Sequence, residues 1–448
     1  MKLEHSQVFE RFVRNIKGQK SFTLTGLTSF SRLLLVKYIS ALSGKKVLFV
    51  TSTEQAGLRY QVDLERIFGI ISDFLPYQNT SPYETVIGNL YDYRKQIAAL
   101  RNRADLVIAP VKALTEKFPT EEFFKTNSLY LKVGESISQG KLLEQLISLG
   151  YKRATMVTDM GEFSIRGDIS DIYPLDKTPV RIEFWGDEIV DIRYFDNETQ
   201  KSIEKLKEIE INPLYKFVLP AVAPEEFSNV LKEQFREEGY FEGVNVYQSY
   251  FNPDLVNVLD YFKDYIVVYD EYPEISAKLN QINETLTNSY NEALKLNLIE
   301  PLREINHFSE SDIIQKAAGL QKISLNNFLS DESNEIIDIN SENVPIFDAD
   351  MDKAAEFMLS KKDYQITIAT DYKERVKEVL AEYGIFEVNY IDNISSLGTI
   401  IPDAKILIIT DRELFNKRQK DIPSGRKRAY KEKAEYIENI NDIKAGEY

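Results

Sequence analysis

A segment near the start of the chain has the position of a phosphate-binding loop but lacks most of its defining residues. The pattern G-x-x-x-x-G-K-[ST] begins at Gly26, which follows an expected strand and precedes an expected helix. The other defining positions hold Ser31, Arg32 and Leu33, where a glycine, a lysine and a hydroxyl residue are required. The Cβ of Ser31 would obstruct backbone amides that close on phosphates, and Leu33 has no oxygen for Mg²⁺. We therefore expect a plain strand–turn–helix corner, with residual nucleotide binding as the alternative.

Two adjacent acids could belong to such a site. The apolar stretch DYIVVYDE ends in Asp270 and Glu271, at the places of a metal-holding aspartate and a water-orienting glutamate. Acids at the end of a strand are also commonly just solvated. Because no competent phosphate loop accompanies them, we expect no catalytic residues, no metal site and no cofactor in this chain.

A second group of residues suits binding rather than catalysis. In the stretch RIEFW, strand alternation puts Ile182 and Phe184 on one face. Arg181 and Trp185, the only tryptophan of the chain, fall on the opposite face. The single tryptophan is thus expected on the charged side of a strand rather than on the apolar side.

Two neighbouring stretches extend this polar face. Arg166 lies opposite Phe163 in EFSIR, and Arg193 falls together with Asp191 in IVDIRYF. Arginine and tryptophan are the residue types that dominate binding hot spots, so these positions are candidates for contact with a partner. The alternative is a salt-bridged sheet face on which Trp185 covers a satellite core.

The segments that must position these residues begin with alternating helices and strands. Over residues 1–125 this alternation indicates a parallel sheet covered on both faces. The expected strands are 21–25, 45–52 and 104–110, and the expected helices are 32–43, 54–68 and one that begins near Pro82. From 126 to 212 the pattern changes to strands of period two with tight turns, which predicts an inserted antiparallel α+β domain.

The second half of the α/β domain is expected at residues 213–343. It contains helices near 224–239 and 254–262 and a strand at 264–271, and we interpret residues 276–343 as helix plus connection. A small βαβ unit at 344–415 forms a third domain. The charged stretch 416–448 is interpreted as a linker.

Composition excludes several classes of protein. At 448 residues the chain corresponds to roughly three domains of ~150 residues each. The absence of cysteine excludes disulfides and thiolate metal sites, and two distant histidines, His5 and His307, argue against an imidazole metal centre or a Ser–His relay. No stretch of about 18 apolar residues and no signal-peptide core occur, so we expect a soluble, cytoplasmic protein.

Charge argues against extended contact with nucleic acid. The formal net charge of -16 repels a phosphate backbone, so duplex binding would require a local basic patch. The candidate patch is the run formed by Arg426, Lys427, Arg428, Lys431 and Lys433. This run is interpreted more simply as part of a solvated linker.

Two long motifs resemble a known family. GEFSIRGDISDIYP at 161–174 and RIEFWGDEIVDIRYFD at 181–196 resemble the signature shared by the excinuclease subunit UvrB and the transcription-repair coupling factors. The loop at Gly26 resembles the degenerate phosphate loop of the coupling factors. The stretch LPYQNTSPYET at 75–85 resembles the segment that opens the following helix in those factors. UvrB carries a long aromatic hairpin there that probes damaged DNA. This chain has only a short connection, despite Tyr91 and Tyr93.

The resemblance implies a fold and a function. The fold would be α/β and α+β multidomain: a degenerate P-loop, helicase-like parallel α/β domain in two halves, an inserted UvrA-binding domain and a small C-terminal α/β domain. The chain would be an adaptor that recruits UvrA of nucleotide excision repair to RNA polymerase stalled at DNA lesions, without ATPase activity of its own. RNA polymerase and DNA would be bound by other domains of a longer parent, whose motor would use ATP and Mg²⁺ as a DNA translocase.

The resemblance also assigns residues. The family's UvrA-contacting positions fall on Arg166, Arg181, Trp185 and Arg193, with tryptophan where the family usually has phenylalanine. Two rival functions remain open at this point. One is a UvrB-like fragment that binds DNA damage or hydrolyses ATP through Arg32 and the two acids at 270–271, and the other is a DNA-binding module that uses the basic run.

Overall fold

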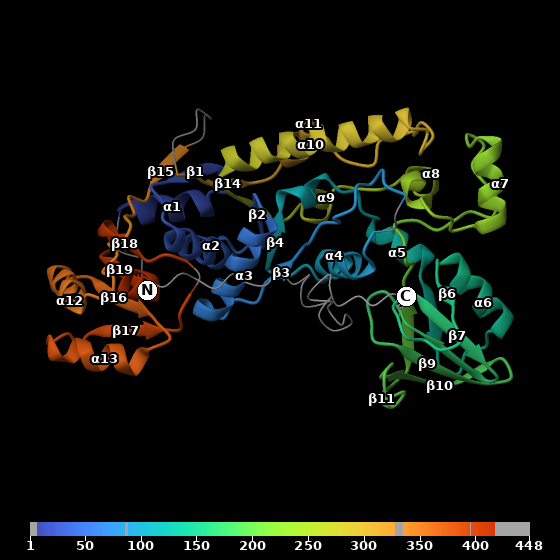
Figure 1. Ribbon diagram of the computed structural model, residues 1–448, viewed down its shortest axis with the longest axis horizontal. Helices are drawn as coiled ribbons and strands as arrows, with labels where there is room; N and C mark the ends of the chain where they lie inside the picture. The colour runs from blue at the N-terminus through green and yellow to red at the C-terminus, as the bar shows by residue number, and fades with distance from the viewer. Residues whose placement is uncertain (1–6, 86–87, 328–334, 395, 417–448) are drawn as a thin grey trace, which may run out of the picture.

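The computed structural model describes residues 7–85, 88–327, 335–394 and 396–416. Its strands form sheets of seven, six, four and two strands. Figure 1 shows the seven-stranded sheet between the four-stranded sheet at one end of an elongated molecule and the six-stranded sheet at the other. The linker expected at 416–448, with its basic run, lies outside the described residues except for Asn416.

The central sheet is wholly parallel. Its strand order is β15-β1-β14-β13-β2-β4-β3. The strands are β1 (Phe22–Thr25), β2 (Val47–Thr51), β3 (Asp73–Phe74), β4 (Leu106–Pro110), β13 (Ile266–Asp270), β14 (Lys322–Leu325) and β15 (Glu335–Asp338). Four of them, β1, β2, β4 and β13, are buried almost throughout, as expected for strands covered on both faces, and all but β1 are mainly apolar.

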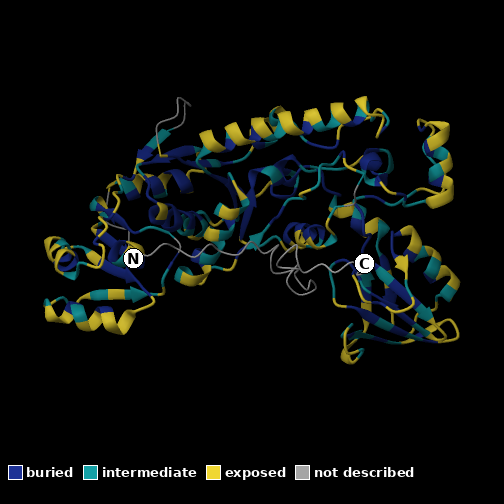
Figure 2. Cartoon of the chain, viewed as in Figure 1, coloured by how far each residue is buried: buried dark blue, intermediate teal, exposed yellow. Residues whose placement is uncertain are grey.

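Alternate residues of these strands supply two separate cores. On one face, Phe22 and Phe49 pack with α1 (Gln7–Lys17), α2 (Ser29–Ser43) and α3 (Glu54–Phe68). On the other face, Leu48 and Val267 pack with a second group of five helices. These are α4 (Leu90–Asn102), η1 (Val111–Thr115), α9 (Val258–Tyr261), α10 (Tyr272–Lys295) and α11 (Glu310–Ala317). The long α10 buries one stripe and leaves its outer side exposed along the top of the view (Figure 2).

The sequence interpretation was wrong for two segments of this domain. The helix expected from Pro82 begins at Leu90, because Asn89 caps it by accepting a hydrogen bond from the Tyr91 amide. Residues 276–343, interpreted as helix plus connection, also contain β14 and β15, which flank β1. Each of these strands has four residues, too few for a period to stand out in a polar segment.

The six-stranded sheet has the order β11-β10-β9-β8-β7-β6 and is antiparallel except for the β6–β7 pair. Its strands are β6 (Lys152–Arg153), β7 (Glu162–Arg166), β8 (Ile169–Ile172), β9 (Val180–Trp185), β10 (Glu188–Phe195) and β11 (Ser202–Leu206). One face is apolar and packs with Leu142 and Leu146 of α6 (Gln139–Ser148). The other face carries the arginines and the tryptophan discussed below.

Short elements connect this sheet to the central one. The two-stranded sheet pairs β5 (Leu129–Lys132) with β12 (Glu208–Ile211), next to α5 (Glu121–Asn127). The helices expected near 224–239 and 254–262 are shorter than expected, at α7 (Asn229–Glu238) and the single turn of α9. With η2 (Val244–Tyr247) and α8 (Gln248–Phe251), α7 extends the same apolar core as the six-stranded sheet.

The four-stranded sheet packs directly on the central domain. Its order is β17-β16-β19-β18, with β18 antiparallel. The elements are α12 (Met351–Ser360), β16 (Gln365–Ala369), α13 (Lys373–Glu382), β17 (Val388–Ile391), β18 (Thr399–Ile401), η3 (Pro402–Ala404), β19 (Ile406–Thr410) and α14 (Asp411–Phe415). Ile401, Ile406 and Ile408 share one core with α2. No helix within the described ranges combines the length and apolarity needed to cross a bilayer.

Candidate functional site

The glycine loop after β1 is closed by another part of the chain. Gly26 has φ of +65°, and a Cβ there would lie 2.1 Å from Asp338 Oδ1 and 2.8 Å from the Asn340 amide nitrogen. Glycine is therefore required because the chain after β15 passes closely over the loop. In a phosphate-binding loop the glycine lets a phosphate approach the backbone closely. Here Asp338 and Asn340 of the same chain make that close approach instead.

The polar groups of this loop already have protein partners. The amide and Oγ of Ser341 both donate to the Gly26 carbonyl, at 2.8 and 2.7 Å. The Thr28 amide donates to Ser341 Oγ at 2.9 Å and to Ser31 Oγ at 2.8 Å, and Thr28 also caps α2. The Thr28 hydroxyl donates to Thr399 Oγ1 of β18 at 2.6 Å. The loop thus joins β15 and the four-stranded sheet to the central domain.

Arg32, at the position of the phosphate-loop lysine, is buried in an ion cluster. Its Nη1 donates to Asp270 Oδ1 at 2.6 Å and to the Leu325 carbonyl at 2.8 Å. Its Nη2 donates to Glu271 and, at 2.8 Å, to Asn327 Oδ1. The predicted candidates Arg32, Asp270 and Glu271 are therefore brought together. Leu325 and Asn327 could not be predicted as members of the cluster, because β14 was not recognised in the sequence.

The groups of this cluster are buried and paired with one another. Burial raises the pKa of Asp270, while Arg32 and the Tyr60 hydroxyl, which hydrogen-bonds to Asp270, act in the opposite direction. Arg32 is 5% exposed, and Leu33 is wholly buried in the core that α2 contributes to. Arg32 pairs with both acids, so the cluster has one carboxyl group more than it has cationic groups, and these contacts clamp the β1–α2 turn to β13 and β14.

The outward face of the six-stranded sheet is the second candidate site. We define the arginine face as Arg166, Asp171, Arg181, Glu183, Trp185, Asp191 and Arg193. Burial in β9 follows the expected alternation, since Ile182 and Phe184 are buried and Trp185 is 80% exposed. The alternative was a salt-bridged sheet face on which Trp185 covers a satellite core. Its second part is wrong, because Trp185 is exposed, but its first part is confirmed by the ion pairs of the face.

Arg181 forms its ion pair within the chain, with Asp171. Its Nε and Nη2 donate to the two carboxylate oxygens of Asp171 at 2.6 and 2.9 Å, and its guanidinium lies 4.6 Å above the ring of Phe195. Asp171 is 1% exposed, and Arg166 donates to it as well, at 3.1 Å. The Arg181 side chain is 15% exposed, whereas that of Arg166 is 53% exposed.

Arg193 is occupied in the same way. It pairs with Glu183 on β9 and with Asp191 on its own strand, and Lys205 of β11 donates to Asp191 at 2.9 Å. The hydrogen bond from Arg193 lowers the pKa of Glu183, and those from Lys205 and Arg193 lower that of Asp191. Arg193 retains 16% exposure of its side chain.

The expectation that all three arginines are available to a partner was thus wrong for two of them. Alternation determines the face of a side chain but not its neighbours on the next strand, and here those neighbours are acids. Trp185 and Arg166 remain accessible. Sequence reasoning also missed Val190, which is 46% exposed at the bulge between Ile189 and Asp191. A bulge interrupts the period of two, so alternation could not locate it.

Comparison with known proteins places this face in a known kind of domain. Residues 129–217 match the model of the UvrB interaction domain. The whole chain is 26% identical to the transcription-repair-coupling factor of Bacillus subtilis, and covers 42% of that protein. The factors of Staphylococcus aureus and Staphylococcus epidermidis are 25% and 26% identical over 97% and 96% of the chain, each covered to 41%. These matches confirm the predicted resemblance, and the chain spans about two fifths of the relatives' length.

Proposed function

We propose that this chain is an adaptor in transcription-repair coupling that recruits UvrA through the arginine face. The proposal is supported by the similarity to transcription-repair coupling factors and by the match of residues 129–217 to a UvrB interaction domain. The observation that carries it is the 80% exposure of Trp185 within that domain. A tryptophan held in the open on a polar sheet face is an anchor for a partner.

The exposure of the residues on this face supports two different roles for them. Trp185 and Arg166 would contact UvrA directly, because both are exposed. Arg166 donates one hydrogen bond, from Nη2, to Asp171. The other N–H groups of its guanidinium can therefore donate a bidentate pair of hydrogen bonds to a carboxylate of the partner. Arg181 and Arg193 would act as positioning residues that hold β8, β9 and β10 in register.

We propose further that this chain has no ATPase activity. The lysine position holds Arg32, which is paired with both acids at 270–271, and the loop that would hold phosphate is filled by the chain after β15. An ATP- and Mg²⁺-dependent translocase, with contacts to RNA polymerase and DNA, is proposed for the length of the relatives that this chain does not cover.

Binding of purified UvrA by isothermal titration calorimetry tests the proposal. Trp185→Ala and Arg166→Ala should each weaken binding, by on the order of 2 kcal/mol, or about 30-fold, for the tryptophan. Phe386→Ala and Arg11→Ala are matched controls, since Phe386 is 75% exposed and the Arg11 side chain is 51% exposed and paired, both away from the face. Wild-type affinity in both test variants would refute the proposed face.

A further inference from the structure

The accessible part of the arginine face lies at one end of its strands, beside two hairpin turns. Residues 167–168 join β7 to β8, and residues 186–187 join β9 to β10. The Phe184 amide donates to the Asp168 carbonyl at 2.8 Å, which brings the first turn next to the end of β9. Trp185 is the last residue of β9 and adjoins the second turn. The two turns therefore lie side by side, next to Trp185.

Trp185 has two exposed neighbours on β10. Glu188 is directly opposite Trp185 in the register of β9 and β10, so the two side chains share a face, with their Cβ atoms about 4.5–5.5 Å apart. Both side chains are exposed, that of Trp185 to 80%. Val190, the additional residue of the bulge that follows, is 46% exposed. An aromatic ring, a carboxylate and an apolar side chain are thus accessible together.

The charged groups at this end of the face are mainly acidic. We define the hairpin end as Arg166, Asp168, Trp185, Asp187, Glu188 and Val190. Its three carboxylates are exposed, and in the part of the chain that the structure describes none of them pairs with a lysine or an arginine. Its guanidinium group, that of Arg166, already donates to Asp171 at 3.1 Å. A partner that approaches the hairpin end therefore meets three free carboxylates and one guanidinium group.

The other cations of the arginine face do not neutralise these carboxylates. Arg181 and Arg193 pair with acids of β8, β9 and β10, and their side chains are only 15% and 16% exposed. Lys205 is 80% exposed but pairs with Asp191. Free carboxylates repel a phosphate backbone, so the hairpin end suits a protein partner rather than a nucleic acid. The complementary charge on that partner is positive.

The pairing of Trp185 with Glu188 suits a single cationic side chain. An arginine or lysine within about 6 Å of a ring centroid is attracted to the face of the ring, most strongly for tryptophan. Over the described ranges, the rings that lie under a cation of this chain belong to tyrosines and phenylalanines, so the Trp185 ring is available. Because Glu188 is its cross-strand neighbour, a cation over the ring can also accept the charge-assisted contact of the carboxylate.

We propose that the hairpin end binds a cationic side chain, arginine or lysine, of UvrA. The charged group would lie over the Trp185 ring and pair with Glu188, and its aliphatic stem would pack on Val190. Asp168 and Asp187 would attract further basic residues of the same surface. The inference rests on the proposed contact with UvrA and adds the chemistry that UvrA must present there, a basic group opposite the hairpin end.

Charge reversal at Glu188 tests this inference, with purified UvrA titrated calorimetrically into the full chain at constant ionic strength. Glu188→Lys should weaken binding about tenfold or more, because two like charges would then face each other. Glu188→Gln keeps the shape of the side chain and should weaken binding in the same direction, by about 2- to 5-fold. Glu208→Lys is the matched control, since Glu208 is exposed on β12, away from the face, and should bind like wild type.

Two substitutions of Trp185 separate a cation over the ring from a plain apolar contact. Trp185→Phe keeps a ring face and should bind within about fivefold of wild type. Trp185→Leu keeps an apolar side chain without a ring and should bind about tenfold or more weakly. Equal affinity of the two variants would overturn the role of the ring, because apolar contact alone would then explain the anchor.

The outcomes distinguish this inference from the proposed function. Wild-type or tighter binding by Glu188→Lys would overturn the inference, because UvrA would then present a neutral or acidic group. If Trp185→Ala and Arg166→Ala weaken binding at the same time, the face itself stands. Wild-type affinity in those two variants as well would overturn the proposed contact with UvrA as a whole.

Discussion

Truncation of Arg181 should destabilise the protein and truncation of Trp185 should not, although both residues lie on the arginine face. Trp185 is 80% exposed, so Trp185→Ala should change local stability by no more than about 0.5 kcal/mol. Arg181→Ala removes two of the three charged hydrogen bonds that Asp171 accepts, at 2.6 and 2.9 Å. The third, from Arg166 at 3.1 Å, remains.

The magnitude for Arg181→Ala follows from the burial of its partner. Breaking a buried ion pair by removing one member costs about 3–5 kcal/mol, because the other charge is left unpaired. Asp171 is 1% exposed, which places it in that class, and the remaining contact with Arg166 reduces the cost. We therefore expect a local destabilisation of about 2–4 kcal/mol.

Native-state hydrogen exchange with mass spectrometry measures this loss of local stability, peptide by peptide, in the full chain. Peptides that cover β8 and β9 should exchange about 30- to 1000-fold faster in Arg181→Ala, and within about twofold of wild type in Trp185→Ala. Addition of Asp171→Asn to Arg181→Ala should recover part of the protection, since the unpaired charge is removed. Binding of UvrA should fall in both single variants, but only that of Arg181→Ala should improve with Asp171→Asn.

Two results would refute this reasoning. Wild-type exchange in Arg181→Ala would mean that the ion pair with Asp171 contributes nothing to the fold, and that Arg181 is free to act as a direct contact. Rapid exchange in Trp185→Ala would mean that the tryptophan is a packing residue in spite of its exposure.

Three further outcomes are expected. The purified chain should release no phosphate from ATP above background, and turnover that Asp270→Ala abolishes would contradict the closed loop. Burial lowers the pKa of His307 from 6.5 to about 4, so its stabilising contribution is complete above pH 6.5 and is lost as the pH falls toward 4. The fall in stability over this range should be smaller in His307→Gln by about 1–3 kcal/mol, measured by urea unfolding at each pH. Duplex DNA should bind weakly with a steep salt dependence in gel shifts, and deletion of 424–433 should remove most of that binding, whereas a preference for damaged DNA would favour the UvrB-like alternative.

The sequence alone was sufficient to predict burial where a short repeat of apolar residues determines which side chains face the core. The period of two separated Ile182 and Phe184 from Arg181 and Trp185, and the five-residue apolar strands β2, β4 and β13 stood out as buried runs. Matching the motif position by position was also enough to predict that Arg32 departs from the phosphate-loop lysine.

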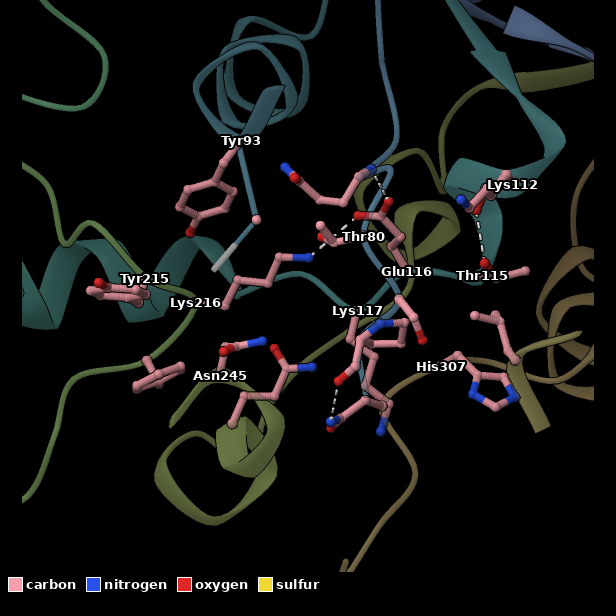
Figure 3. A pocket seen from close by; sticks show the side chains of 18 of the residues that line it. Thr80, Tyr93, Lys112, Thr115, Glu116, Lys117, Tyr215, Lys216, Asn245 and His307 are labelled. Atoms are coloured by element: carbon pink, nitrogen blue, oxygen red, sulfur yellow. Dashed lines mark hydrogen bonds and ion pairs between the residues drawn. The ribbon is translucent and has the colours of Figure 1, made fainter. Parts of the chain in front are cut away.

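The contacts between distant segments could not be predicted in this way. Asp171 and Arg181 are opposite each other in the register of β8 and β9, and the residues between these strands contain no tight-turn signal that fixes the register. A cavity between the central domain and residues 214–217 is lined from seven stretches of chain, and no local pattern marks it (Figure 3). The Arg32 cluster needed β14, whose four residues were too few to recognise.

The position of β1 has a consequence for the order in which the chain matures during synthesis. Within the described strands, β1 pairs only with β14 and β15, and β14 begins about 300 residues after β1 ends. At roughly 5–20 residues per second, the ribosome needs about 15–60 s to supply those partners. Strands β5 to β12 pair only among themselves, so their sheets can close during this interval. We expect the arginine face to be complete on the ribosome while β1 still lacks both of its neighbours.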